Sequence, residues 1–129
     1  MVTVKRVYEA PADTDGYRVL IDGLWPRGVS KANAHLDAWE KEVAPSAELR
    51  KWYGHDPEKW ADFQTRYERE LKREGASAAL KRIAARARRG RVTLVYASHA
   101  GEISNAAVLL RLLKRQLNRA PRQAKSPGR

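Results

Sequence analysis

The chain has 129 residues, of which 43% are hydrophobic, and a formal net charge of +11. This length suits a single domain that buries its own core, and the absence of cysteine excludes disulfides, thiolate metal sites and cysteine nucleophiles. The longest unbroken apolar run, residues 106–110, is far shorter than the roughly 20 residues that cross a bilayer. We therefore expect no membrane association and a cytoplasmic location.

The positive charge is concentrated in the second half of the chain. Residues 1–71 carry 11 Lys and Arg against 13 Asp and Glu, whereas residues 72–129 carry 15 against 2, a balance of +13. A surface this basic attracts polyanions, although basic helix faces can also serve only to keep a protein in solution.

The first elements expected along the chain are two strands. Residues 3–9 are rich in Val and Tyr, residues 17–22 alternate loosely, and residues 10–16 form the turn between them. After these strands, apolar residues recur at helical spacing and predict a helix that ends at Pro45; they are Leu36, Trp39 and Val43.

Two further helices are expected before residue 75. Ser46 is a suitable N-cap for a short helix that Gly54 ends in a left-handed conformation. Asp56 and Pro57 then begin the clearest helix. One face of this helix carries a regular stripe of apolar residues and is expected to pack against the rest of the domain. The stripe consists of Trp60, Phe63, Tyr67 and Leu71.

Gly75 interrupts this pattern, and a second amphipathic helix follows and ends at Gly90. Residues 92–97 are almost continuously apolar and predict a central strand that is buried on both faces. A last helix begins at Asn105, and the sequence beyond Ala120 is typical of a frayed tail.

This order of elements predicts an α/β fold, with a small, mostly parallel sheet flanked by helices and a basic C-terminal helix. We expect one compact domain over residues 1–120 and a basic, flexible tail over residues 121–129. An α+β arrangement is the alternative. In an open parallel sheet, ligands bind beyond the C-terminal ends of the strands, and polar loops follow two of the expected strands there.

The first of these loops contains the densest group of charged, aromatic and conformationally permissive residues in the chain. Its candidate ligand-binding residues are Asp22, Trp25, Arg27, Gly28 and Lys31. An arginine can hold a phosphate or carboxylate in two-pronged fashion, and a glycine lets backbone N–H groups approach an anion. In the alternative interpretation the aspartate and the arginine form an internal ion pair and the tryptophan packs in the core.

The second loop, residues 97–105, leads into the last helix. Asn105 at the helix start can leave backbone N–H donors facing an anion. His99 and Glu102 are a possible acid–base pair, although such residues in one exposed loop are usually only solvated.

A third group of candidates surrounds the short helix: Ser46 and Arg50, which are four residues apart, and His55 beside a capping aspartate. His55 also suits a hydrogen-bonded turn. The three histidines, His35, His55 and His99, are far apart in the sequence, and we predict neither a metal site nor a cofactor.

A different class of function, nonspecific nucleic-acid binding, would use the basic half. The candidate residues are Arg82, Arg86, Arg89, Arg111, Lys114 and Arg115. The first three are spaced to share one helix face. Tyr96 is the single aromatic residue after position 71, so base stacking by this surface is not expected.

Several segments resemble the YeaO-like family of bacterial proteins, a domain of unknown function numbered 488. They are Asp22-Gly-Leu-Trp-Pro-Arg-Gly-Val-Ser-Lys31, Trp39-Glu-Lys-Glu-Val-Ala-Pro-Ser46, Glu48-Leu-Arg-Lys-Trp-Tyr-Gly-His-Asp-Pro57 and the strand–loop–helix pattern of residues 92–110. The resemblance extends to about residue 118. It implies a compact cytoplasmic α/β domain and no established activity. The residues that match the family pattern are Asp22, Trp25, Pro26, Arg27, Gly28, Lys31, Pro45, Ser46, Arg50, His55 and Asn105.

The chain also departs from that pattern. The resemblance implies an arginine where this chain has Gly23, and a Lys-Asp pair where it has Ser98 and His99. More distant members resemble proteins with a cysteine and a histidine near this strand end, so a thiol mechanism does not transfer to a chain that lacks cysteine.

These observations together predict a pocket for a small anion, a phosphate or a carboxylate, at the C-terminal edge of the sheet. Arg27, Lys31, Arg50 and the helix start at Asn105 would hold the anion. Asp22 would orient Arg27, and Trp25 or Trp52 would form a wall. The candidate catalytic residues are His55, His99 and Asp22, with a histidine as the proton carrier.

Overall fold

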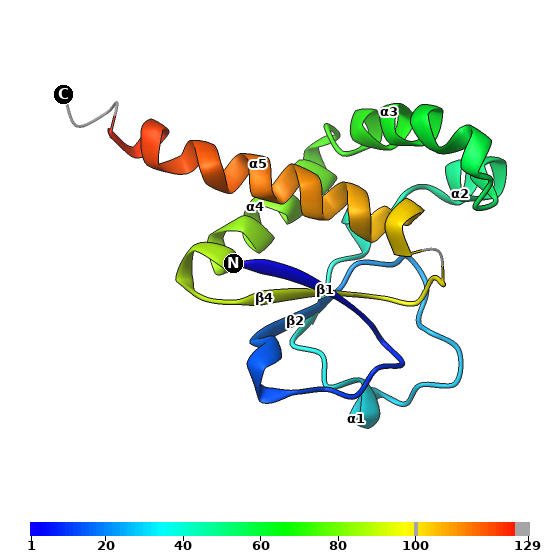
Figure 1. Cartoon of the computed structure of the whole chain (residues 1–129), viewed down its shortest axis with the longest axis horizontal. Coiled ribbons are helices and arrows are strands. Elements are labelled where there is room, and N and C mark those ends of the chain that lie inside the picture. Colours follow the sequence, from blue (N-terminus) through cyan, green and yellow to red (C-terminus); the bar gives the residue numbers. More distant parts are fainter. Residues whose placement is uncertain (100, 126–129) are drawn as a thin grey trace.

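The computed structural model describes the backbone of residues 1–99 and 101–125, and the side chains of these residues as far as Arg119. Within these ranges four strands form one sheet: β1 (Val2–Arg6), β2 (Tyr17–Leu20), β3 (Ala38–Trp39) and β4 (Val92–Tyr96). Their order is β1-β4-β2-β3, and every paired strand is parallel to its neighbour (Figure 1). The predicted α/β class is confirmed, and β4 is the buried inner strand that its apolar run indicates.

Five α-helices accompany the sheet in the described part of the chain: α1 (Lys31–Ala34), α2 (Ala47–Tyr53), α3 (Trp60–Glu70), α4 (Glu74–Arg89) and α5 (Asn105–Lys125). Ser46 begins α2, because its Oγ accepts a hydrogen bond from the Leu49 N–H, and Gly54 ends it with a φ of 54°. Asp56 caps a 3₁₀ turn, Pro57–Lys59, that leads directly into α3. No helix in the described part of the chain has the length and apolar character needed to span a membrane.

The two faces of the sheet are covered differently. In β4, Val92, Leu94 and Tyr96 join the large core made with α2 to α5, whereas Val95 joins a small core on the opposite face. Figure 1 shows α4 and α5 on one side of the sheet and α1 on the other. The second face is closed mainly by the segment that runs from the end of β2 through β3, which carries Trp25 and Trp39.

The helix predicted through Leu36, Trp39 and Val43 is wrong. The edge strand β3 occupies the middle of this segment, where Asp37 N–H donates to the Arg18 carbonyl and Glu40 N–H donates to the Leu20 carbonyl. Leu36 and Trp39 pack in the small core and Val43 in the large one. The helical spacing therefore arises from residues that serve two cores on opposite faces of the sheet.

Three other boundaries differ from expectation. Gly75 lies inside α4, which begins at Glu74. Residues 10–16 do not form a simple turn, because β1 and β2 are separated by β4 and run in the same direction, so this stretch is part of a crossing connection. The last helix continues past Ala120 to Lys125, and the remainder of the expected tail, residues 126–129, lies outside the described residues.

Candidate functional site

The loops that follow β2 and β4 meet because these two strands are adjacent and parallel. Asp22 joins them: its Oδ2 accepts a hydrogen bond of 2.9 Å from the Ala97 N–H, and its Oδ1 accepts one of 3.1 Å from Asn105 Nδ2. Asn105 Nδ2 also lies 3.4 Å from the Ile21 carbonyl oxygen. One carboxylate thus ties the end of β2 to the end of β4 and to the start of α5.

The electrostatic surroundings of Asp22 are mixed. Burial raises the pKa of Asp22 above its ordinary value, while the hydrogen bonds from Asn105 and Ala97 and the positive charge of Arg50 act in the opposite direction. Because burial outweighs the other effects, this carboxyl group is less acidic than an exposed aspartate.

A cavity of about 540 Å³ opens beside this junction. Its lining comes from the ends of β1, β2 and β4, from the segment around α2 and from the starts of α3 and α5. Six of the residues predicted from the sequence line it: Asp22, Trp25, Arg27, Arg50, His55 and Asn105. The folding of the chain therefore brings together residues that are up to 83 positions apart.

Two arginines supply positive charge to the cavity. Arg27 and Arg50 are both exposed, and neither guanidinium group forms a hydrogen bond or ion pair with a described residue. The internal ion pair between Asp22 and Arg27, one of the two interpretations of the loop, is not formed. His55 lines the same cavity from a left-handed backbone conformation with a φ of 58°.

Aromatic side chains give the cavity rigid walls. Trp25 Nε1 donates to the Val29 carbonyl at 2.6 Å, and the Trp25 ring packs edge-on against Trp39 with 5.4 Å between ring centroids. Deeper in the cavity, Tyr53 and Phe63 stack with their centroids 4.1 Å apart. Tyr53 is fixed further, because its hydroxyl donates to the Ile103 carbonyl at 2.6 Å.

Other predicted residues lie outside this cavity. Lys31 begins α1, and Gly28 forms a turn with a φ of 77°. Ser46 has a structural role, because its backbone N–H and its hydroxyl both donate to Glu70 in addition to capping α2. His99 is exposed and does not contribute to the lining. Trp52 does not form a wall, since it packs beneath Arg66 and Lys59.

Sequence reasoning missed two exposed lining residues, Tyr8 and Leu24. Leu24 lies next to Trp25 in the first candidate loop, so its position in that loop could have indicated that it lines the cavity. Tyr8 follows β1, and its hydroxyl donates to the Arg27 carbonyl at 3.0 Å. Its place at the site depends on β1 lying next to β4, which no local pattern indicates.

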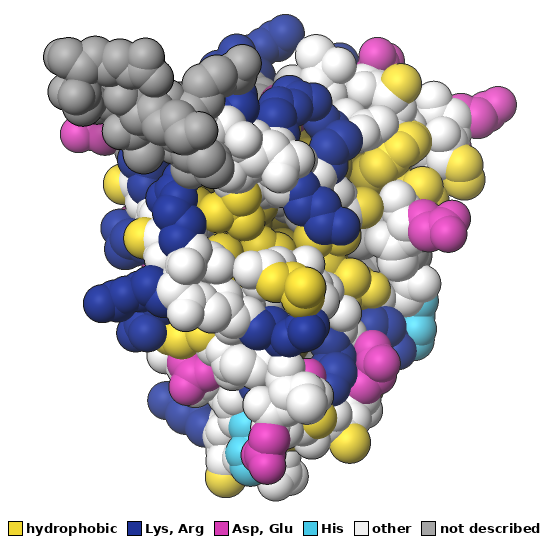
Figure 2. Space-filling model, turned by 60° about the vertical axis from the view of Figure 1, so that its left-hand side comes forward, with side chains coloured by type: hydrophobic (Ala, Val, Ile, Leu, Met, Phe, Trp, Pro, Cys, Tyr) yellow, Lys and Arg dark blue, Asp and Glu magenta, His cyan; other side chains and the backbone are white. Residues whose placement is uncertain are grey.

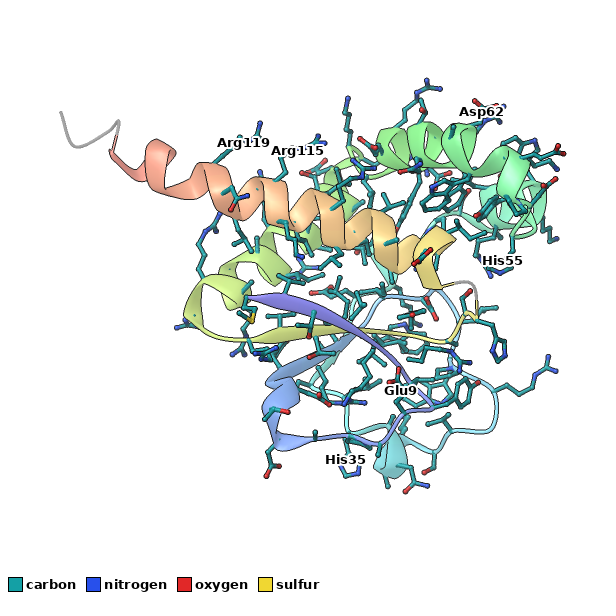
Figure 3. The ribbon with its side chains drawn as sticks, viewed as in Figure 1. Glu9, His35, His55, Asp62, Arg115 and Arg119 are labelled. Carbon is teal, nitrogen blue, oxygen red and sulfur yellow. The ribbon has the colours of Figure 1, made fainter. Side chains whose placement is uncertain are left out.

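Among the side chains that the structure describes, those of residues 1–99 and 101–119, no group of three or more potential metal ligands occurs. Figure 3 shows His55 close to α2 and His35 beside α1, on opposite sides of the sheet.

The basic half of the chain divides into paired and unpaired groups. Arg82 forms two hydrogen bonds with Glu40, Arg86 lies over the Tyr17 ring, and Arg111 pairs with Glu68. Arg89, Lys114 and Arg115 have no such partner among the described residues. Figure 2 shows Lys and Arg side chains gathered around a strip of hydrophobic side chains, and Figure 3 shows Arg115 and Arg119 on the side of α5 away from the sheet.

The fold and the cavity define a small α/β domain with a polar and aromatic pocket at the C-terminal edge of a parallel sheet. Residues 1–128 match the family model described as the inactive DUF488-N3 subclade, and the chain belongs to the DUF488 family. The resemblance noted from the sequence motifs is thereby confirmed.

Two uncharacterized relatives support this assignment. The chain is 45% identical to a protein of Mycobacterium tuberculosis over 112 residues, which cover 87% of this chain and 92% of that protein. It is 39% identical to the protein YeaO of Escherichia coli over 108 residues, which cover 84% of this chain and 92% of YeaO. No solved structure matches the chain significantly.

Proposed function

We propose that this protein is a binding domain for a small anion, a phosphate or a carboxylate, and that it acts without catalytic turnover. The observation that carries the proposal is the presence of two unpaired guanidinium groups, Arg27 and Arg50, in the lining of one cavity. Arginine binds such anions through two parallel hydrogen bonds and stays charged over the physiological pH range.

Asn105 and His55 are further polar residues of the proposed site. The Asn105 amide is held by Asp22, so its position is fixed before a ligand arrives. Asp22 itself would act as a positioning residue, because both of its oxygens already accept hydrogen bonds from the chain.

One comparison favours binding over turnover, because the family model that matches the chain is described as an inactive subclade. Of the two candidate proton carriers, His55 lines the cavity and His99 does not, so a reaction at this site would depend on His55.

The proposal is tested by calorimetric titration with inorganic phosphate and with acetate. Arg27→Gln and Arg50→Gln should each weaken binding at least tenfold, whereas Arg88→Gln, which alters an exposed arginine on α4, should leave it unchanged. Equal binding by all three variants and the wild type would remove the basis of the proposal.

A second candidate function, nonspecific nucleic-acid binding, is favoured by the balance of +13 in residues 72–129, with 15 basic and 2 acidic residues. Its affinity should fall steeply with the logarithm of salt concentration. Joint substitution of Arg89, Lys114 and Arg115 by Gln should weaken binding to a DNA duplex, whereas Arg50→Gln should not. The reverse pattern, or no binding at low salt, would reject this function.

A further inference from the structure

We infer that the cavity takes an anion that carries a flat aromatic ring, such as an aryl phosphate or aryl carboxylate, in preference to a bare inorganic ion. This inference rests on the anion site proposed above. It concerns what lies beside the charged group of the ligand.

The first observation is the exposure of apolar side chains at the cavity. Among the described residues, four large apolar side chains are exposed, and two of these, Leu24 at 65% and Tyr8 at 50%, line this one cavity. Exposed apolar surface that gathers at a concave site indicates contact with a ligand or a partner. An inorganic anion would leave both side chains facing water.

The second observation is that the aromatic walls are held in place. The half-buried Trp25 ring is fixed through its Nε1 bond to Val29 and its edge contact with Trp39, whose own Nε1 donates to the Asp22 carbonyl at 2.6 Å. A ring that is fixed in advance can stack on a planar ligand without losing rotational freedom at the moment of binding.

The third observation is that an aromatic wall is linked to a binding arginine. The Tyr8 hydroxyl donates to the backbone carbonyl of Arg27, and the Arg6 guanidinium lies 5.0 Å from the centroid of the Tyr8 ring. Arg6 is anchored in turn by the Ala97 and Ser98 carbonyl oxygens. The ring and the backbone of the residue that would hold the anion are therefore parts of one hydrogen-bonded unit.

The volume of the cavity agrees with an organic ligand. About 540 Å³ falls within the range of roughly 300 to 1,000 Å³ that is typical of sites for small organic molecules. The remaining lining includes the apolar side chains of Pro45, Tyr53 and Phe63 beside those of Lys51 and Ser98, so apolar surface for a ring adjoins the charged groups.

The test compares three probes by calorimetric titration: inorganic phosphate, glycerol 3-phosphate and phenyl phosphate. Phenyl phosphate should bind at least tenfold more tightly than the other two. Leu24→Ser should abolish most of this difference without weakening the binding of inorganic phosphate, and since Leu24 is exposed the variant should fold. Val4→Ser, which alters an exposed apolar residue outside the cavity, is the matched control.

A second measurement uses the indole N–H signals in a ¹⁵N-resolved NMR spectrum. Phenyl phosphate should shift the Trp25 signal more than the Trp60 signal. Equal affinity for the three probes, with dependence on Arg50 retained, would overturn the aromatic preference and leave the anion site standing. Failure of all three probes to bind would overturn both proposals.

Discussion

The side-chain amide of Asn105, the first residue of α5, donates a hydrogen bond to the carboxylate of Asp22 across 3.1 Å. Asp22 lies two residues after the end of β2. The Ala97 N–H donates to the other oxygen of the same carboxylate. This junction holds together the two loops that form the candidate site, and it can be tested separately from any ligand.

Replacing Asn105 by Asp should weaken the junction in a way that depends on pH. Two carboxyl groups would lie about 3 Å apart, so one of them must be protonated for the native packing to persist. We expect a loss of roughly 1 to 3 kcal/mol at pH 7 and a smaller loss at pH 4.5, measured by urea unfolding. Asn118→Asp, an exposed change on the same helix, is the control, and an identical pH response of the two variants would contradict this account.

The raised pKa of Asp22 has its own effect on stability. Because burial makes the folded-state pKa higher than the unfolded one, the native state binds more protons over this interval, and stability falls as pH rises from the ordinary aspartate value through the folded value. Asp22→Asn should remove this contribution and flatten the decline. The slope of melting temperature against pH, measured between pH 4 and pH 7 for the wild type and the variant, tests this expectation. An unchanged slope in the variant would show that Asp22 is not the group responsible.

Asp15 should give the opposite pH dependence. Burial raises its pKa, but hydrogen bonds from Lys5, the Ala12 N–H and Arg18 outweigh this effect and hold the pKa below its ordinary value. The resulting stability is present above the ordinary aspartate pKa and is lost as pH falls through the folded one. Asp15→Asn should cost about 3 kcal/mol at pH 7, because Arg18, which pairs with Asp15 at 2.6 Å, would be left buried without its counter-charge.

The comparison for Asp15 is Asp13→Asn in the same 3₁₀ turn, where the side chain is exposed. Urea unfolding at pH 7 and at pH 3 should show a large, pH-dependent effect for Asp15 and almost none for Asp13. Similar values for the two substitutions would argue against a stabilising role of the buried pair.

Three glycines allow steric clash to be separated from backbone strain. A Cβ at Gly16 would lie 2.3 Å from the Arg91 carbonyl oxygen, and φ is 66°. At Gly28 φ is 77°, but no heavy atom lies within 4 Å of such a Cβ. We expect Gly28→Ala to cost about 1 kcal/mol from strain alone, and Gly16→Ala to cost clearly more, as measured by chemical denaturation.

The third glycine, Gly75, should respond differently. A Cβ there would meet Glu42 Oε2 at 1.8 Å, which is the end of an exposed side chain that can move aside. Since Ala favours a helix by roughly 1 kcal/mol over Gly, Gly75→Ala should be neutral or slightly stabilising. A loss as large as that of Gly16→Ala would mean that the position of Glu42 is required by the fold.

Local signals predicted most of the elements. The cap at Ser46, the left-handed Gly54 and the apolar run of β4 each act within a few residues, and the structure has them as expected. The prediction of a helix was wrong where one segment contributes residues to two cores. The spacing of Leu36, Trp39 and Val43 is helical, but backbone hydrogen bonds to β2 hold the segment extended.

For the candidate site, the sequence indicated which loops matter but not which side chains face each other. Asp22 and Asn105 were both candidates, yet their bond depends on β2 lying beside β4, a long-range relationship. Tyr8 was missed for the same reason. Ser46 was chosen for a ligand although its hydroxyl is used by Leu49 and Glu70, because a cap and a binding group have the same residue preferences.

The edge strand β3 has only two residues, and it pairs with β2 alone. It is also the end of the segment that carries Leu24 and Trp25. Few backbone hydrogen bonds must break for β3 to detach from β2, so the amide protons of Asp37 and Glu40, which donate to β2, should exchange with deuterium much faster than those of β4. Transient detachment would let one wall of the cavity admit a ligand while the central strands stay protected.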